Sequence, residues 1–481
     1  MIPKGYIFGV AYAMICLLLS LILYKLGMPK KYTRKVVHIL VGFEWVILYH
    51  FMGAGIHFLL VCILFLVLLT VAYKGRLMPM ISSEGDNAPG TVYYAVAMTG
   101  VATVGCFVPG VMLPFGIGVM CTSLGDGFAG VVGQLITAKN PKVFGKKTLY
   151  GTLTSFVVSA GSAYAISAIY GLGFGAAECL AIGLVSTELE LVTPRGLDNI
   201  SITWGTTALA YAFVAFSGIY DYLLPILLTP VIIIFATSKK ALTTDGIVAA
   251  IVLDLAVSIA LGNFGFLILC VFFVGSIIID KLKKCHKNKG REDIEAKGSC
   301  RDYMQVIANG AVSFISAIAF LITGQRIFVI AFVTSMAEAF ADTAASGIGA
   351  FADNVYDPFK RKKCEKGLSG GMSVEGTLAS LVGACFVSMV AYATGFVGYG
   401  ITEFFVVSGA AFLGGIFDSF LGSMLQVKYK CKVCDSLTER TEHCEEQTEH
   451  YSGFKYVDND VVNIASCAFS TILAVAITLL I

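Results

Sequence analysis

The sequence predicts an all-α, polytopic integral membrane protein, and three observations support this fold class. Hydrophobic residues make up 57% of the 481 residues, whereas charged residues make up only 14%. Apolar runs of about 17–25 residues, long enough to cross a bilayer as a helix, recur along the whole chain. Lysine and arginine gather in alternate loops between these runs, as they do in cytoplasmic loops. We therefore expect about 13–16 hydrophobic helices in two related bundles.

The candidate spans follow one another with short connections. The first apolar run follows Lys4, as the apolar region of a signal peptide follows a basic residue. However, it has no small-x-small cleavage site and leads straight into a second apolar segment. We therefore expect a retained helix. Short pieces broken by glycine can be re-entrant, which leaves the helix count open. The candidate spans are 7–24, 36–52, 56–73, 92–108, 110–136, 149–169, 173–187, 203–219, 222–237, 245–259, 262–280, 304–323, 326–350, 373–395, 400–426 and 460–481.

Basic residues predict the orientation of the helices. The turns on one side contain no lysine or arginine except Arg326. The opposite loops, which we expect to face the cytoplasm, contain basic residues at 25–35, 74–76, 139–147, 239–240, 281–291, 360–363 and 428–432. The 14 cysteines are mostly scattered through apolar runs, which suits a reducing compartment better than a disulfide framework. We expect membrane lipids as partners and no nucleic acid, and the oligomeric state stays open.

Four phrases occur twice and in the same order, which favours a duplication. "LGDGFAGVVG" matches "FADTAASGIG", and in both the last glycine stands seven residues after the acid, Asp126 or Asp342. The other pairs are "RKVVHILVG" with "RDYMQVIANG", "GKKTLYGTL" with "GGMSVEGTL", and "LDNI" with "VDNDVVNI". Small residues also recur in any packed membrane bundle, but that alternative does not explain why Asp126 and Asp342 stand at the same offset from the last glycine of their phrases. We expect two domains, 1–237 and 238–481, as parallel repeats whose polar phrases face the cytoplasm.

The polar residues of the first half suit phosphoryl transfer. Carboxylates hold Mg²⁺, cations neutralise phosphate, and amides at helix starts receive phosphate oxygens. Asp126 is the strongest candidate, because an isolated carboxylate between apolar segments is costly unless it has a function. The lysines could instead be membrane anchors, the glutamates could solvate a loop, and His38 could pack at the interface. The set is Asp126, Lys146, Lys147, Thr148, Glu188, Glu190, Asp198 and Asn199. "GKKT" lacks the G-x-x-x-x-G-K frame, which disfavours a P-loop ATPase.

Together, "RKVVHILVG", "GTVYY", "LGDGFAGVVG", "GKKTLYGTL" and "ELVTPRGLDNI" resemble the signature set of the phytol kinase, dolichol kinase and CTP-dependent diacylglycerol kinase superfamily. The resemblance covers about residues 30–235. It implies a membrane enzyme that phosphorylates a lipid alcohol, commonly from CTP. It also implies catalytic or metal-binding roles for Asp126, Lys146, Lys147 and Asp198, and nucleotide binding by Arg34, His38, Gly145, Thr148, Glu188, Asp198 and Asn199.

From about Lys240 onward the chain is similar to the membrane family that contains phytyl-phosphate kinase. The phrases "KALTTDGIVAA", "ADTAASGIG", "GGIFDSFLGSMLQ" and "VDNDVVNI" follow that family's order. Where the family has "ADTWASE", this chain has "ADTAASG", which lacks the aromatic residue and ends in Gly347 instead of an acid, and Glu338 is the candidate substitute for the missing acid. The resemblance implies catalytic Asp342 and Asp418, magnesium ligands Glu338, Asp342, Asp418, Asp458 and Asp460, and nucleotide binding by Asn309, Gly370, Gly371, Ser373, Asp458 and Asn459.

The phrase "GGMSVEGTL" lacks the two lysines of "GKKTLYGTL", and we explain this difference by the chemistry of the two substrates. A lipid alcohol is a neutral nucleophile and needs a base, for which Asp126 is our choice. A lipid monophosphate is already an anion, so it needs metal-binding acids rather than a base. A flexible "GGMS" loop would let backbone amides approach phosphate where "GKKT" uses charge, with Lys360–Lys363 and Lys366 just upstream.

The segment from 431 to 450 is rich in metal-binding side chains. Cys431 and Cys434 form a Cys-x-x-Cys pair, and His443 and Cys444 follow about ten residues later. Three thiols and an imidazole can enclose a structural Zn²⁺. The spacing matches no standard zinc finger, so a solvated loop with incidental thiols is the alternative.

We therefore predict a bifunctional isoprenoid salvage kinase. It would convert a prenol of the phytol, geranylgeraniol or farnesol type to its monophosphate and then to its diphosphate, with Mg²⁺ and a nucleoside triphosphate, CTP or ATP. One alternative is a CTP-dependent diacylglycerol or dolichol kinase with a degenerate second half. Another is a transporter built from duplicated halves. The sequence leaves prenol length, phosphate donor and activity of each half open.

Overall fold

Helices dominate the protein. The computed structural model describes residues 4–75, 90–136, 140–193, 196–216, 218–286, 300–364 and 367–481. Within these ranges 13 helices are long and apolar enough to cross a membrane, which confirms the prediction of an all-α, polytopic protein. The chain is an integral, multi-pass membrane protein. The basic positions Arg76, Lys139, 287–291 and Lys366 lie outside the described residues.

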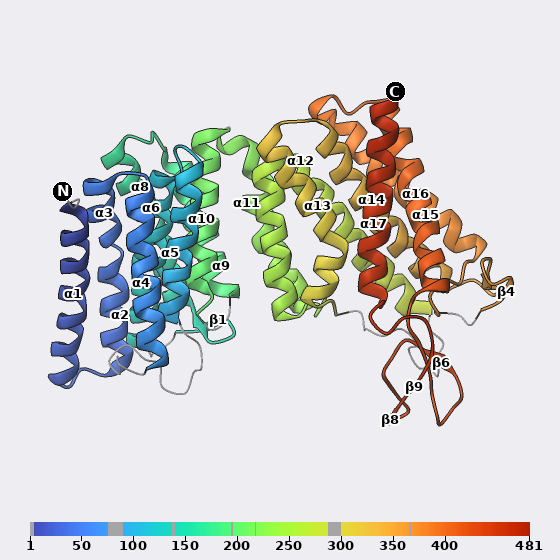
Figure 1. The fold of residues 1–481 in the computed structure, drawn as a ribbon, viewed down its shortest axis with the longest axis horizontal. Coiled ribbons are helices and arrows are strands. Elements are labelled where there is room, and N and C mark those ends of the chain that lie inside the picture. Colours follow the sequence, from blue (N-terminus) through green and yellow to red (C-terminus); the bar gives the residue numbers. More distant parts are fainter. Residues whose placement is uncertain are drawn as a thin grey trace. The chain divides into compact units, whose positions relative to one another are not determined.

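The chain divides into two compact units, Met1–Asp221 and Tyr222–Ile481 (Figure 1). The first unit contains α1 (Lys4–Lys25), α2 (Lys30–Val41), α3 (Glu44–Met52), α4 (Ile56–Lys74), α5 (Gly90–Phe107), α6 (Met112–Met120), a π-helical turn η1 (Cys121–Asp126), α7 (Gly127–Leu135), β1 (Lys142–Phe144), β2 (Lys147–Thr148), α8 (Leu149–Tyr170), α9 (Ala176–Val192), α10 (Asp198–Ala215) and η2 (Ile219–Tyr222), whose last residue opens the second unit.

The second unit adds a stranded loop to its helices. It contains α11 (Leu223–Ser238), α12 (Thr244–His286), α13 (Tyr303–Thr323), α14 (Ile327–Gly349), β3 (Tyr356–Asp357), β4 (Lys362–Lys363), α15 (Val374–Thr394), η3 (Phe396–Gly398), α16 (Ile401–Met424), β5 (Lys428–Lys430), β6 (Leu437–Thr438), β7 (Glu442–His443), β8 (Glu446–Gln447), β9 (Glu449–Ser452) and α17 (Asn459–Leu480).

Most predicted spans correspond to helices. Gly262 has a φ of 58° and interrupts α12 at the first residue of the predicted span 262–280, directly after the gap that follows the span 245–259. The spans 173–187 and 203–219 correspond to α9 and α10, which are not among the 13 long apolar helices. α9 has only 17 residues, fewer than any of the 13 spans, and it also contains three glutamates.

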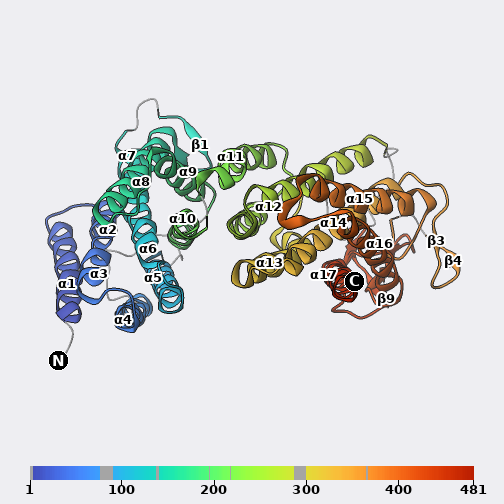
Figure 2. The same cartoon turned by 90° about the horizontal axis from the view of Figure 1, so that it is seen from above.

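Each unit has one central helix, and both central helices carry one of the repeated acids. The segment Met112–Leu135 is 72% buried and α14 is 78% buried, whereas the other spans are 17–39% buried. Seen from above, α14 lies between α12, α13, α15, α16 and α17 (Figure 2). Asp126 and Asp342 thus lie on the two most enclosed helices of the chain.

The central helix of the first unit crosses α8 at a contact between small residues. A Cβ atom added at Gly151 would lie 3.1 Å from the carbonyl oxygen of Ala129 and 3.6 Å from the Cα of Gly133. Side chains larger than hydrogen would push the two helices apart. The glycines of "LGDGFAGVVG" and "GKKTLYGTL" therefore serve one helix crossing.

The second unit repeats this crossing between α14 and α15. A Cβ atom added at Gly376 would lie 3.0 Å from the carbonyl oxygen of Ala345 and 3.3 Å from the Cα of Gly349. These residues stand at the same offsets in the matched phrases, and each unit places a two-stranded hairpin between the crossing helices. The shared local geometry supports duplication of the segment. The boundary at 237 and the parallel orientation of the repeats stay predictions.

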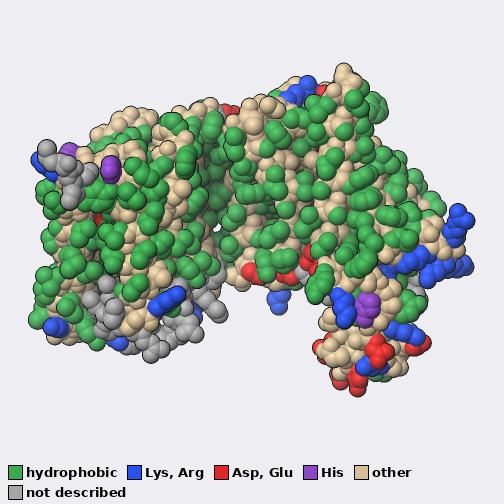
Figure 3. All heavy atoms as spheres, viewed as in Figure 1, with side chains coloured by type: hydrophobic (Ala, Val, Ile, Leu, Met, Phe, Trp, Pro, Cys, Tyr) green, Lys and Arg blue, Asp and Glu red, His purple; other side chains and the backbone are tan. Residues whose placement is uncertain are grey.

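Hydrophobic side chains cover most of the helical surface (Figure 3). Charged side chains gather instead on the loops, including the loop that joins α16 to α17. This distribution is expected when helices face lipid and loops face water.

Candidate functional site

A cavity of about 600 Å³ collects most of the polar residues predicted in the first half. Its predicted lining residues come from α2, η1, the β1–β2 hairpin and α10. They are Arg34, His38, Asp126, Lys146, Lys147, Thr148, Asp198 and Asn199. Gly145 and Glu188 are not among the lining residues. One site thus forms from segments more than 150 residues apart in the sequence.

Asp126 ends the π-helical turn of the central helix and is 8% exposed. Single π turns within α-helices often occur at functional sites. Lys35 donates a hydrogen bond of 2.9 Å to Asp126 Oδ2, and His38 Nε2 lies 3.2 Å from the same oxygen. His38 Nε2 is also 3.0 Å from the carbonyl oxygen of Thr122. The carboxylate is therefore held by two residues of α2 beside the cavity.

Lys147 forms a second charged group in the same cavity. Its Nζ atom donates a hydrogen bond to Glu190 and lies 3.9 Å from Asp198 Oδ2. Burial alone would lower the pKa of Lys147, but the carboxylates of Glu190, Asp126 and Asp198 outweigh it and raise that pKa. Lys147 therefore keeps its positive charge at neutral pH.

The β1–β2 hairpin explains why "GKKT" contains a glycine. Gly145 has a φ of 52° and lies in the turn between the two strands, where a left-handed backbone favours glycine. The turn places Lys146 and Lys147 at the cavity. A direct phosphate contact of Gly145 remains a prediction.

The cavity changes from charged to apolar along α2 and α3. Arg34, Lys35 and His38 line its charged part, whereas the part further along the same helices is lined by Val41 and Leu48 and, as its one acidic side chain, by the buried Glu44. At 1.5 Å per residue, the lining from 34 to 48 spans about 20 Å. Apolar residues of three further helices, α1, α4 and α5, complete this part, namely Ala13, Leu17, Cys62, Phe65, Leu69 and Met98. The cavity therefore suits a molecule with a polar head and a long apolar chain.

The oxygen atoms of this cavity fit a magnesium ion. Asp126, Glu190 and Asp198 contribute three carboxylates to one lining. Within the described residues, Glu190 Oε2 and Asn199 Oδ1 are buried without a hydrogen-bond partner. Buried oxygens of this kind are costly unless a ligand or ion satisfies them, and Mg²⁺ prefers oxygen ligands.

The second unit also gathers carboxylates around its central helix. Glu338 is 1% exposed on α14, and Asp342 follows one turn later. Asp418 on α16 lies close enough to both for their negative charges to act on it. Ser466 of α17 donates a hydrogen bond of 3.3 Å to Asp418. Three predicted acids on two helices thus face one region of the bundle.

Two oxygens in this region have no hydrogen-bond partner within the described residues. They are Glu338 Oε1 and Asn463 Oδ1, and both belong to buried side chains. The other carboxylate oxygen of Glu338 accepts a hydrogen bond of 2.7 Å from the thiol of Cys467. These oxygens fit a magnesium ion as those of the first unit do.

The "GGMS" segment is a packed turn, so our expectation of a flexible loop was wrong. Gly370 has a φ of 88°, and an added Cβ atom would lie 2.5 Å from the backbone of Ser423. Met372 exchanges two backbone hydrogen bonds of 2.9 Å with Tyr356. Ser373 caps α15, because its hydroxyl accepts a hydrogen bond of 3.0 Å from the amide of Gly376. The two glycines serve close packing, and phosphate binding by their amides stays a prediction.

The remaining predicted residues of the second half lie near helix starts or in a separate cavity. Asp458 caps α17 through a hydrogen bond of 3.0 Å from the amide of Val461, Asn459 is exposed, and Asp460 is buried in the first turn. Asn309 lines an apolar cavity of about 120 Å³, together with Arg301 and Gln305. Metal or nucleotide binding by these residues stays a prediction.

The four predicted zinc ligands lie together in the loop between α16 and α17. Cys431, Cys434, His443 and Cys444 offer one ligand atom each, all within 4.8 Å of one another. No other group of three or more metal-binding side chains with such spacing occurs in the described part of the chain.

Sequence reasoning missed residues that complete both sites. Lys35 was taken only as part of a basic loop, although its spacing of three from His38 puts both on one helix face. Glu190 lines the cavity, and the sequence placed it in the candidate set but assigned nucleotide binding only to its neighbour Glu188. Glu439 accepts hydrogen bonds from Ser369, which lies 70 residues earlier in the sequence, and no local sequence pattern predicts that contact.

Known proteins share parts of this sequence. The family described as "Integral membrane protein DUF92" matches residues 227–471. The chain is 29% identical over 192 residues to phytol kinase of Synechocystis, covering 38% of this chain and 80% of that protein. It is 29% identical over 244 residues to protein VTE6, chloroplastic, of Arabidopsis thaliana, covering 49% of this chain and 64% of VTE6. An uncharacterized membrane protein of Synechocystis, sll0875, is 29% identical over 196 residues, which is 40% of this chain and 74% of that protein. No solved structure matches the chain significantly.

Proposed function

Because the chain belongs to the DUF92 integral membrane family and is also similar to a phytol kinase, we propose that it is a bifunctional prenol and prenyl-phosphate kinase. The first unit would phosphorylate a prenol, and the second unit would phosphorylate the resulting monophosphate. The product would be a prenyl diphosphate.

The observation that carries the first activity is the graded lining of the 600 Å³ cavity. A prenol would place its chain among the apolar residues of α1, α3, α4 and α5 and its hydroxyl near Asp126. Asp126, held by Lys35 and His38, would accept the hydroxyl proton as the oxygen attacks the γ-phosphate. Lys146 and Lys147 would neutralise the charge that develops on the transferred phosphoryl group.

The nucleotide would bind at the hairpin side of this cavity. Thr148, Arg34 and Asn199 offer donors near the two lysines. Asp198 and Glu190 would hold a magnesium ion, which would supply positive charge to offset the negative charge of the triphosphate. CTP is our preferred phosphate donor because the lipid kinase superfamily that the first half resembles commonly uses it.

The second activity would use the carboxylates of the central bundle. A prenyl monophosphate brings its own negative charge, so no base is required. Glu338, Asp342 and Asp418 would hold magnesium between the two phosphates. Arg301, beside a small apolar cavity lined by Ile233, Leu253 and Phe273, would receive the acceptor phosphate.

An assay of purified protein with labelled CTP or ATP and a panel of lipid alcohols tests this proposal. We expect both a monophosphate and a diphosphate from a prenol, and magnesium dependence of both. A monophosphate alone would favour a diacylglycerol or dolichol kinase with a degenerate second half. Substrate flux across vesicles without nucleotide turnover would favour a transporter and would overturn the proposal.

A further inference from the structure

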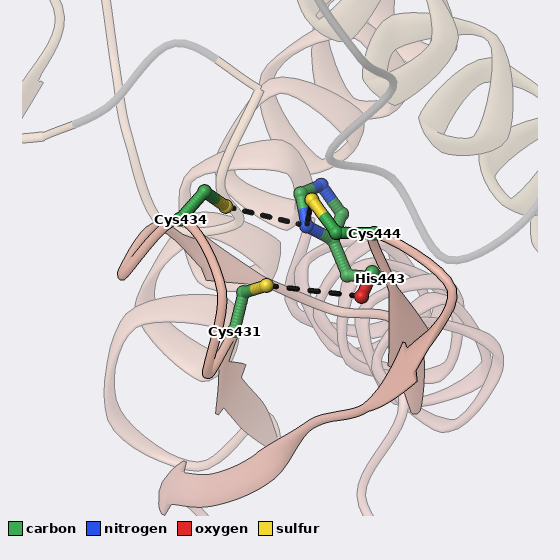
Figure 4. A group of neighbouring side chains, drawn as sticks. All are labelled: Cys431, Cys434, His443 and Cys444. Atoms are coloured by element: carbon green, nitrogen blue, oxygen red, sulfur yellow. Dashed lines mark hydrogen bonds between the residues drawn. The ribbon is translucent and has the colours of Figure 1, made fainter.

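We infer that Cys431, Cys434, His443 and Cys444 hold one structural Zn²⁺ that orders the loop between α16 and α17 (Figure 4). Cys434 Sγ lies 3.5 Å from His443 Nδ1, and Cys444 Sγ lies 3.3 Å from the same nitrogen. Zinc bonds of about 2.3 Å to sulfur and about 2.0 Å to nitrogen, at tetrahedral angles, place sulfur and nitrogen about 3.5 Å apart. The two measured spacings are those that one tetrahedral ion requires.

The backbone around the first ligand pair has the form of a metal-binding turn. The amide of Val433 donates a hydrogen bond of 3.4 Å to Cys431 Sγ, and the amide of Asp435 donates one of 3.1 Å to the carbonyl oxygen of Cys431. The amide of Val433 would stabilise a metal-bound thiolate and fix its direction, and the bond from Asp435 closes the turn that contains Cys434. The pair is therefore oriented before any ion arrives.

The second ligand pair sits on a strained turn. Cys444 and Glu445 have φ values of 53° and 62°, and Asp435 beside the first pair has a φ of 60°. Residues with side chains rarely adopt this left-handed conformation, which costs about 1–3 kcal/mol unless the surroundings enforce it. Three such residues next to ligands indicate that ligand geometry shapes the loop.

The short strands of the loop give it little stability of their own. Its strands β5 to β9 have two to four residues each and pair into small ribbons. A segment of this size buries too little apolar surface to hold its shape alone, so metal ions or disulfides commonly support it. The three cysteines are free thiols, and Cys431 is 1% exposed. Three sulfurs and one imidazole favour zinc over magnesium or calcium.

The ordered loop holds the "GGMS" turn. Lys428 Nζ donates a hydrogen bond of 2.7 Å to the carbonyl oxygen of Ser369. Glu439 accepts hydrogen bonds from the amide of Ser369, at 2.9 Å, and from its hydroxyl. Glu439 lies between the two ligand pairs in the sequence, so the ion would fix its position. Ser369 directly precedes Gly370, so the zinc site would position the turn that the proposed second kinase uses for phosphate. This positioning role rests on the proposed function, whereas zinc binding itself does not.

Metal analysis of the full-length protein tests zinc binding without any activity. We expect one equivalent of zinc per purified chain by plasma mass spectrometry, and loss of that zinc in Cys434→Ser and in His443→Gln. Cys385→Ser on α15, outside the ligand group, is the matched control and should keep its zinc. Cobalt substitution should give the intense visible bands of a tetrahedral thiolate site. Sub-stoichiometric zinc in the wild type, zinc retained in Cys434→Ser, or a Cys434–Cys444 disulfide in the unreduced peptide map would overturn the inference.

The positioning role has its own readout. Removing zinc from the wild-type protein with a strong chelator should lower phosphorylation of prenyl monophosphate at least about tenfold, and added zinc should restore it. Phosphorylation of a prenol by the first unit should not change. Unchanged monophosphate phosphorylation after zinc loss would overturn the positioning role. Stoichiometric zinc in a protein that phosphorylates neither substrate would instead overturn the proposed function and leave the zinc site standing.

Discussion

Lys35 Nζ lies 2.9 Å from Asp126 Oδ2 and 3.1 Å from the carbonyl oxygen of the same residue. This pair links α2 to the end of the π-helical turn across 91 residues of sequence. A lysine that holds both the side chain and the backbone of one acid fixes the direction of that acid.

Lys35→Ala should therefore impair prenol phosphorylation without affecting the second step. A hydrogen bond between charged groups is worth about 1.5–3 kcal/mol, which corresponds to about 10- to 100-fold in rate. Lys31→Ala, an exposed residue of the same helix, is the control. Separate assays with a prenol and with its monophosphate measure the two steps. Equal loss in both assays would show that Lys35 supports the whole fold rather than the first site.

We predict that replacing Lys147 lowers the free energy of unfolding by an amount that does not depend on pH near neutrality. Neighbouring carboxylates raise its pKa above the ordinary value, so its stabilising charge is complete below about pH 10 and is lost only as the pH rises through the raised value. Lys147→Met should lower the free energy of unfolding by about 1–3 kcal/mol, equally at about pH 8 and about pH 9, where the carboxylates that face it are ionised.

Lys146→Met is the control for this measurement, because Lys146 lines the same cavity and should change stability by no more than about 0.5 kcal/mol. Thermal unfolding in detergent at both pH values provides the comparison. A Lys147 effect that shrinks between those pH values would contradict the argument.

The repeated phrases allowed much of this arrangement to be predicted. Glycines at equal offsets from Asp126 and Asp342 indicated equivalent helices, and both helices are the buried centres of their units. Charge patterns and family motifs indicated most of the charged residues that line the first cavity. Contacts such as Ser369 with Glu439 could not be predicted, because they depend on how loops fold back over many residues. The tight packing of Gly370 was misread as flexibility, since composition alone does not reveal a neighbouring backbone.

Gly370→Ala should selectively damage the second kinase step. The positive φ and the 2.5 Å approach of Ser423 leave no room for a methyl group, so the turn must shift. We expect at least about tenfold slower conversion of monophosphate to diphosphate, equivalent to about 1.4 kcal/mol. Gly409→Ala on α16 meets open space and should have little effect. Full activity of Gly370→Ala would show that this turn has no role in the second reaction.

Glu338→Gln should raise the magnesium concentration required for the second step. The substitution keeps the shape of the side chain but removes the charge that would attract the ion, and Glu338 Oε1 has no partner within the described residues. Magnesium titration of monophosphate phosphorylation measures the shift, which we expect to be about 10- to 100-fold. Glu375→Gln, an exposed residue in the first turn of α15, is the control. An unchanged magnesium requirement in Glu338→Gln would exclude Glu338 as a ligand.

The division of labour between the units is tested most directly by supplying each substrate to two variants, Asp126→Asn and Asp342→Asn, with labelled nucleotide. We predict that Asp126→Asn fails to phosphorylate a prenol but still converts added prenyl monophosphate to the diphosphate. We predict that Asp342→Asn converts a prenol only as far as the monophosphate. Diphosphate formation from a prenol by Asp342→Asn, or loss of both reactions in Asp126→Asn with the fold intact, would contradict the account.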